Sequence, residues 1–189
     1  MSLDRKLYGV CFLLCALMFA IGFLVAISLT LPDILLPQAG NPAPDSSIID
    51  RLRTASTFKL ILFNNSKVFL LLTLGILTCG ILSVIQLFVT GALIGGIVRF
   101  GLTQGASQSL LWAALLPHGV LELPAFMVVA ALGLYFPSRI HRHIQGLAID
   151  WIKEVKTYGL LALGAYLVLF LAAVIEAFLT PSIAAKFLH

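Results

Sequence analysis

The chain has 189 residues, of which 60% are hydrophobic and 11% charged, and its mean hydropathy is +1.07. Soluble domains have about 45–50% apolar and about 25% charged residues. A chain of this size needs far more polar surface if it is to face water on all sides. The composition therefore indicates a membrane protein and argues against a soluble enzyme or a nucleic-acid binder. In a membrane protein, the net charge of +4 indicates a preferred orientation and contact with anionic lipids rather than binding to nucleic acid.

The first apolar segment, residues 7–31, contains no charged residue and is long enough to cross a bilayer. Arg5 and Lys6 precede it, as in a secretory signal peptide, but the apolar stretch is too long and no clear small-x-small cleavage site follows. We interpret it as a retained helix. Its Cys11 and Cys15 share one helical face, where we expect small packing residues rather than metal ligands.

The uncharged run 68–98 is too long for one upright helix. At about 1.5 Å per residue it would extend about 45 Å, against a hydrocarbon core of about 30 Å. One steeply tilted helix would fit, and so would two spans joined by a tight turn. Polar and small residues near the middle of the run favour two spans, at 66–82 and 84–100.

The second of these spans carries Gly91 and Gly95 in a G-x-x-x-G spacing, followed directly by Gly96. Small residues at this spacing let a neighbouring helix approach closely, but they do not identify that helix. Arg99 lies at the end of the same span, from which its long side chain can extend to the interface.

Residues 110–136 form the next span, and Pro117 and Pro124 lie within it, with Gly119 between them. Each proline removes a backbone donor and disfavours helix at the preceding residue. In lipid, the carbonyls freed in this way must be satisfied by protein or water. We therefore expect a broken or re-entrant helix that faces the bundle interior. The final span is expected at 159–180.

Two amphipathic segments, 46–63 and 138–157, combine apolar residues at helical spacing with basic residues. This pattern is typical of helices that lie in the membrane interface. We expect the first to stop at Asn64-Asn65-Ser66. That trio matches a glycosylation acceptor, but its closeness to the next span favours a helix cap.

Residues 1–189 are thus expected to form one integral membrane domain, an all-α transmembrane bundle of about five spans with two interfacial helices. With five spans and a cytoplasmic N-terminus, the inner side carries Arg5, Lys6, Arg139, Arg142, Lys153 and Lys156. The outer side carries Arg51, Arg53, Lys59 and Lys67. The excess of basic residues inside favours this orientation, whereas four spans would reverse it.

Glu122 lies in mid-span between the two prolines, in the string P-H-G-V-L-E-L-P over residues 117–124. An ionisable residue there costs about 2.5–3.5 kcal/mol on insertion scales, and it suggests function. His118 precedes it by four residues, so a helix places both on one face. Glu122 and His118 could satisfy each other and the freed carbonyls, or serve a proton- or substrate-linked transport path. A metal site would need more ligands than these two.

Glu176 lies near the end of the last span, where we expect its carboxylate to reach the interface. Pairing with His118 or Arg99 across the bundle is the alternative. The sequence contains no H-E-x-x-H, no G-x-S-x-G, no phosphate-binding loop and no paired aspartate motif. We therefore expect no enzymatic activity, no cofactor and no metal.

The block from residue 64 to residue 136 resembles the stage II sporulation protein M family. The resemblance rests on the asparagine pair at 64–65, the glycine-rich helices and the string P-H-G-V-L-E-L-P-A at 117–125. The family's hallmark is a P-H-G-x-x-E-x-P stretch in a span, preceded by an asparagine near the start of the second span. Thr90 stands before Gly91 where the resemblance predicts asparagine.

The resemblance implies a multi-span protein of a prokaryotic cytoplasmic membrane without catalytic activity of its own. The founding member looks like a membrane anchor for cell-wall hydrolases during spore engulfment, and similar proteins occur in gene groups for circular bacteriocins. We therefore expect a scaffold or subunit of a membrane complex, with lipid, other membrane or envelope proteins and a second copy of itself as candidate partners. One alternative is a permease-like subunit that moves a peptide, lipid or ion past Glu122, and another is an intramembrane metalloenzyme.

Overall fold

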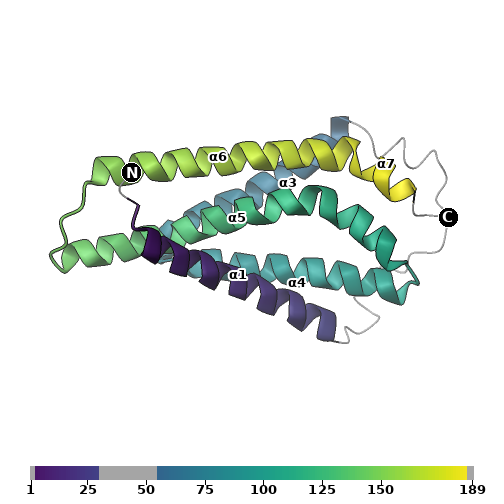
Figure 1. Cartoon of the computed structure of the whole chain (residues 1–189), viewed down its shortest axis with the longest axis horizontal. Helices are drawn as coiled ribbons and strands as arrows, with labels where there is room; N and C mark the ends of the chain where they lie inside the picture. The colour runs from purple at the N-terminus through teal and green to yellow at the C-terminus, as the bar shows by residue number, and fades with distance from the viewer. Residues whose placement is uncertain (1–2, 30–54, 187–189) are drawn as a thin grey trace.

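The computed structural model describes residues 3–29 and 55–186. In these ranges it contains helices and no strand: α1 (Arg5–Ser28), α3 (Ala55–Leu74), the short 3-10 helix η2 (Gly75–Thr78), α4 (Ile81–Thr103), α5 (Gln108–Ile144), α6 (Trp151–Phe178) and α7 (Thr180–Ala185). Within the described ranges, five helical segments are long and apolar enough to cross a membrane. They lie side by side along one axis and alternate in direction (Figure 1). The prediction of an all-helical, five-span fold is confirmed.

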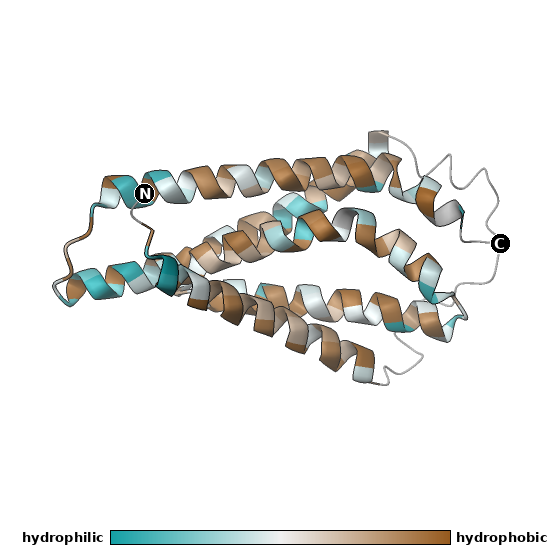
Figure 2. Cartoon of the chain, in the orientation of Figure 1, coloured by the Kyte–Doolittle hydropathy of each residue, from teal (hydrophilic) through white to brown (hydrophobic). Residues whose placement is uncertain are grey.

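Hydrophobic residues cover the helices along most of their length, as a surface facing lipid requires (Figure 2). Leucines such as Leu13, Leu77 and Leu160 are largely exposed on the outside of the bundle. Hydrophilic residues gather at the end where α1 begins and where α5 meets α6. A further hydrophilic patch is visible midway along the bundle.

A tight turn between α3 and α4 divides the long uncharged run into two helices, which is the arrangement that its polar and small residues favoured. The turn residues Cys79 and Gly80 both adopt left-handed backbone conformations, with φ of 52° and 87°. Ser83, in the first turn of α4, donates a hydrogen bond to the Leu72 carbonyl at 2.9 Å. The turn thus satisfies polar groups at the point where the chain reverses.

The glycines of α4 pack against α1 of the same chain. A Cβ atom on Gly91 would lie 2.2 Å from the Phe19 carbonyl oxygen, and one on Gly95 would lie 2.5 Å from that of Phe23. The two backbones therefore touch directly, which only glycine permits. A Cβ on Gly96 would meet nothing within 4 Å, so this glycine lies outside the contact.

The expected stop at Asn64-Asn65-Ser66 is wrong, because α3 runs without interruption from Ala55 to Leu74. Residues 55–63 are the first part of this membrane-spanning helix and not a separate interfacial helix, while 46–54 lie outside the described residues. Asparagine inside a helix costs only a fraction of a kcal/mol. A hydrogen bond from Asn65 to a neighbouring helix offsets that cost.

The expected interfacial helix at 138–157 is also wrong, because α5 continues to Ile144 and α6 already begins at Trp151. The physical reason is a buried ion pair between the two helices. Arg139 and Glu154 are only 8% and 2% exposed, and Nη2 of Arg139 lies 2.9 Å from Oε1 of Glu154. Because these charges face each other, α5 and α6 both extend beyond the ends of the spans predicted from hydropathy, which were residues 136 and 159.

The break expected at Pro117 and Pro124 takes the form of a bend. Helix α5 stays helical through both prolines and through Pro137, and Figure 1 shows it curving toward its N-terminal end. Its spanning part is Gly119–Ile144, and Gln108–Pro117 forms a shorter apolar portion. A kink at proline follows from the lost amide and the ring's clash with the preceding turn.

Candidate functional site

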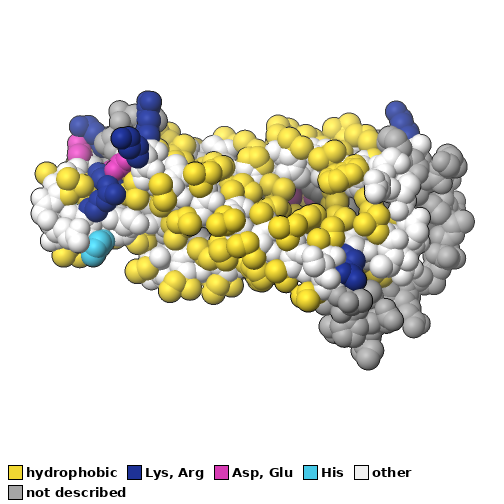
Figure 3. Space-filling model, turned by 60° about the horizontal axis from the view of Figure 1, so that its bottom comes forward, with side chains coloured by type: hydrophobic (Ala, Val, Ile, Leu, Met, Phe, Trp, Pro, Cys, Tyr) yellow, Lys and Arg dark blue, Asp and Glu magenta, His cyan; other side chains and the backbone are white. Residues whose placement is uncertain are grey.

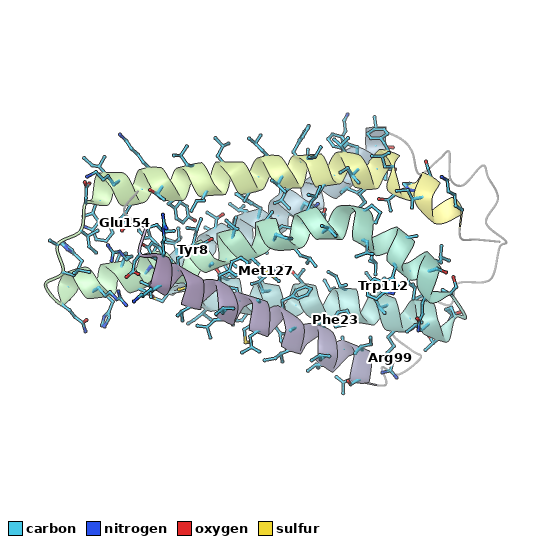
Figure 4. All side chains as sticks on the ribbon, viewed as in Figure 1. Tyr8, Phe23, Arg99, Trp112, Met127 and Glu154 are labelled. Atoms are coloured by element: carbon cyan, nitrogen blue, oxygen red, sulfur yellow. The ribbon has the colours of Figure 1, made fainter. Side chains whose placement is uncertain are left out.

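A cavity of about 1120 Å³ lies between α3, α4 and α5, with contributions from α1 and α6. We call it the lateral cavity. Its walls are mostly apolar, and Figure 4 shows Phe23 of α1 with Trp112 and Met127 of α5 along the space between these helices. Two lining residues, Leu60 and Leu93, are 69% and 63% exposed. The cavity therefore opens sideways onto the apolar surface of the bundle.

The polar wall of the lateral cavity centres on Asn65 of α3 and Glu122 of α5. Asn65 is buried, and its Nδ2 donates a hydrogen bond to Oε1 of Glu122, which is half-buried. Both side chains line the cavity. The pair joins two helices at mid-bundle, and the bend in α5 lies beside it. Asn64 also lines the cavity but is exposed.

Glu176 of α6 supplies a second carboxylate to the same cavity. It is half-buried, and within the described part of the chain neither it nor Glu122 forms an ion pair. The alternative partner Arg99 is engaged elsewhere, since its Nη1 donates to the Ile27 carbonyl at 2.8 Å. That carbonyl belongs to the last turn of α1, so Arg99 satisfies a helix end rather than a carboxylate.

The remaining predicted site residues all lie on α5, but they do not all line the lateral cavity. Gly119 and Pro124 line the lateral cavity, and a Cβ on Gly119 would meet nothing within 4 Å. His118 lies on α5 one turn before Glu122, but the structure does not describe its side chain. Pro117 lies outside the lining of this cavity and borders a smaller one that it shares with Ile183 of α7.

Sequence reasoning missed other polar residues of the cavity. Lys67 of α3 is exposed at the cavity rim, with its Nζ 4.3 Å from the centroid of the Phe63 ring. Gln86 and Thr90 of α4 also line the wall, and the Thr90 hydroxyl donates to the Gln86 carbonyl at 2.8 Å. The sequence held no clear signal for this position, because Lys67 was counted among the basic residues of the outer side, next to the predicted start of a span.

A second polar cluster, also missed, closes the end of the bundle where α1 begins. The Tyr135 hydroxyl donates to Glu154 at 3.2 Å and accepts from the Asp4 amide at 3.1 Å. Asp4 caps α1 by accepting from the Leu7 amide, and its Oδ2 lies 2.9 Å from Nη1 of Arg142. The backbone hydrogen bond from Leu7 and the Arg142 charge lower the pKa of Asp4. This cluster fastens α1 to α5 and α6.

The polar groups of the lateral cavity can recognise a ligand through hydrogen bonds and charge. The cavity offers carboxylates, amides and hydroxyls within apolar walls. Across residues 3–29 and 55–186, no three histidine, cysteine, aspartate or glutamate side chains gather as they would around a metal ion. Figure 3 shows a recess in the hydrophobic surface of the bundle. The magenta of Asp and Glu side chains is visible at the base of this recess.

Fold and site together define a helical membrane protein with a side-opening cavity. The chain belongs to the stage II sporulation protein M family, whose model matches residues 11–181. It is similar to an uncharacterized protein of Methanocaldococcus jannaschii, with 30% identity over 129 residues that cover 67% of this chain and 72% of that protein. No solved structure matches the chain.

Proposed function

We propose that this protein is a non-enzymatic scaffold subunit of a membrane complex and that its lateral cavity receives a membrane-embedded partner. We place it in a prokaryotic cytoplasmic membrane with its N-terminus inside. The resemblance to a family whose founding member looks like an anchor for cell-wall hydrolases makes envelope proteins the candidate partners. A second copy of the chain is a further candidate.

The observation that carries the proposal is the sideways opening of the cavity. A transport path would be expected to open toward water at an end of the bundle, whereas exposed leucines border this cavity. A partner already in the bilayer can enter such a cavity without crossing water. Inside, it would meet apolar walls and the Asn65–Glu122 pair, which gives the site polar specificity.

Substitution of Gly119 by leucine is expected to block the lateral cavity and to leave the fold intact. A leucine side chain there would point into open space, and replacing glycine in a helix is favourable by up to about 1 kcal/mol. We expect Gly119→Leu to fold as well as the wild type but to lose the complex, measured as particle mass after mild extraction from native membranes. The matched control is Gly164→Leu on α6, where a Cβ also meets nothing.

Both variants retaining the complex would contradict the proposal. Loss of the complex in both would also contradict it, because the effect would then come from the added bulk and not from the cavity. Protein level and melting temperature are measured in parallel, so that a folding defect is distinguished from lost assembly.

The second candidate function is a permease-like subunit, and the two carboxylates within one cavity favour it. In this function Glu122 binds the moving ion or substrate. Glu122→Gln would then abolish a gradient- or nucleotide-dependent flux in vesicles while the complex stays intact. Under the scaffold proposal, the cavity supports no such flux in the wild type or in the variant.

A further inference from the structure

The charges around the lateral cavity do not balance. Glu122 and Glu176 reach it from α5 and α6, and Lys67 is the cation among its described lining residues. Lys67 is exposed at the rim with its ammonium over the Phe63 ring, and it forms no ion pair with either glutamate. When both carboxylates are ionised they outnumber this cation by one, which favours an occupant that supplies a second cation.

The hydrogen bonding of Glu122 leaves room for that cation. Asn65 donates to Oε1, and no described side chain donates to Oε2. The amide of Asn65 holds the carboxylate in place, and its own position on α3 is fixed by burial. A lysine or arginine arriving from the open side would add a charge-assisted hydrogen bond to a carboxylate that is already oriented.

The dimensions of the lateral cavity match a helix. Along α3 its lining runs from Leu60 to Leu71, which is about 17 Å at 1.5 Å per residue. A volume of about 1120 Å³ over that length gives a mean cross-section of about 66 Å². A helix about 10 Å across has a cross-section of about 80 Å². One helix can therefore seat most of its width in the cavity while its outer face stays in lipid.

We propose that the occupant is a single transmembrane helix of another protein that carries one lysine or arginine at the depth of Glu122. This inference rests on the proposed function and adds the chemistry of the partner. Basic residues within membrane helices pair with acidic ones or with carbonyls, because lipid offers no other partner. The charge pair selects the partner and sets its depth, and the apolar walls provide the contact area.

The test uses full-length protein in phosphatidylcholine nanodiscs and synthetic single-span peptides of leucine and alanine. The peptides are identical except for lysine, leucine or glutamate at the centre. Cys79 is exposed and Cys11 and Cys15 are buried, so one dye can be attached to the native chain at Cys79. Energy transfer from labelled peptide to this dye reports binding. We expect the lysine peptide to bind about tenfold more tightly than the leucine peptide.

Substitutions at the carboxylates should remove this preference. Glu122→Gln still offers an acceptor to Asn65 and is expected to fold, yet it should bind the lysine and leucine peptides about equally. Glu176→Gln should reduce the preference in part. Asp150→Asn is the matched control, because it removes an acid outside the cavity and asparagine still caps α6. It should leave the preference unchanged.

Equal binding of the lysine and leucine peptides to the wild type would overturn this inference, while loss of the complex in Gly119→Leu would still support the proposed function. Binding that Gly119→Leu does not weaken would overturn it too, since the peptide would then sit elsewhere. A cavity that takes photoactivatable phosphatidylcholine and no peptide would identify a lipid as occupant. Restored binding between Glu122→Lys and the glutamate peptide would support the charge pair directly.

Discussion

Substitution of Gly91 by alanine tests the contact that holds α1 to α4. The new Cβ would lie 2.2 Å from the Phe19 carbonyl oxygen, whereas an ordinary contact begins at 3.4 Å. The helices must therefore separate by about 1.2 Å along this contact, because backbone atoms cannot move aside. A radial gap of about 0.5–1 Å already removes a quarter to a half of the dispersion energy of an atom pair. Overpacking of this kind costs about 1–3 kcal/mol.

The matched control is Gly96→Ala, five residues further along the same helix, where the new Cβ meets nothing within 4 Å. Both substitutions gain the same helix propensity of about 0.5–1 kcal/mol, so the difference between them isolates the steric cost. We expect Gly91→Ala to be less stable than Gly96→Ala by about 1–3 kcal/mol, measured by unfolding in SDS or by steric trapping in bicelles.

Equal stability of the two variants would refute the backbone contact between α1 and α4. So would a Gly91→Ala protein that unfolds normally but no longer self-associates, because the glycines would then serve a contact between copies. Gly95→Ala provides an intermediate case. Its Cβ would lie 2.5 Å from the Phe23 carbonyl oxygen, which requires a smaller shift.

Three further predictions concern the polar clusters. Arg139→Ala should destabilise the protein by about 3–5 kcal/mol, because Glu154 would stay buried without its partner, and Arg139→Met combined with Glu154→Leu should recover most of this loss in thermal melts. Asn65→Leu should cost about 1–3 kcal/mol by removing the donor to Glu122, whereas Glu122→Gln should cost less in the same melts. The folded-state pKa of Asp4 is lowered, so its stabilising contribution is present above the ordinary value of 3.8 and is lost as the pH falls through the folded-state pKa. Asp4→Asn should therefore melt below the wild type at pH 7, and the gap should close in acid.

Hydropathy, the distribution of charge and the positions of the prolines together predicted the number of spans and the region of the bend. The thickness of the hydrocarbon core limits how an apolar run of a given length can cross a bilayer. Two prolines within one span disturb its helix. Two spans were predicted for the central run, at 66–82 and 84–100, but the turn at Cys79-Gly80 lies inside the first of these ranges, a few residues before the predicted boundary.

The placement of polar residues was much less predictable from the sequence. Asn65 suits a helix cap and a contact between helices equally well, and only the position of Glu122 on a neighbouring helix decides between them. Arg139 and Glu154 resemble residues of an interfacial helix until their helices are brought together. Likewise, G-x-x-x-G spacing reveals close packing but not that α1 is the neighbour.

Site-specific photo-crosslinking in native membranes tests the central claim most directly. A photoreactive residue at Leu93 stands at the opening of the lateral cavity, and one at Leu163 stands on the exposed face of α6 outside it. We expect a protein adduct of one defined mass from position 93, its loss in the Gly119→Leu background, and no such adduct from position 163. Adducts to lipid alone at both positions would contradict the central claim.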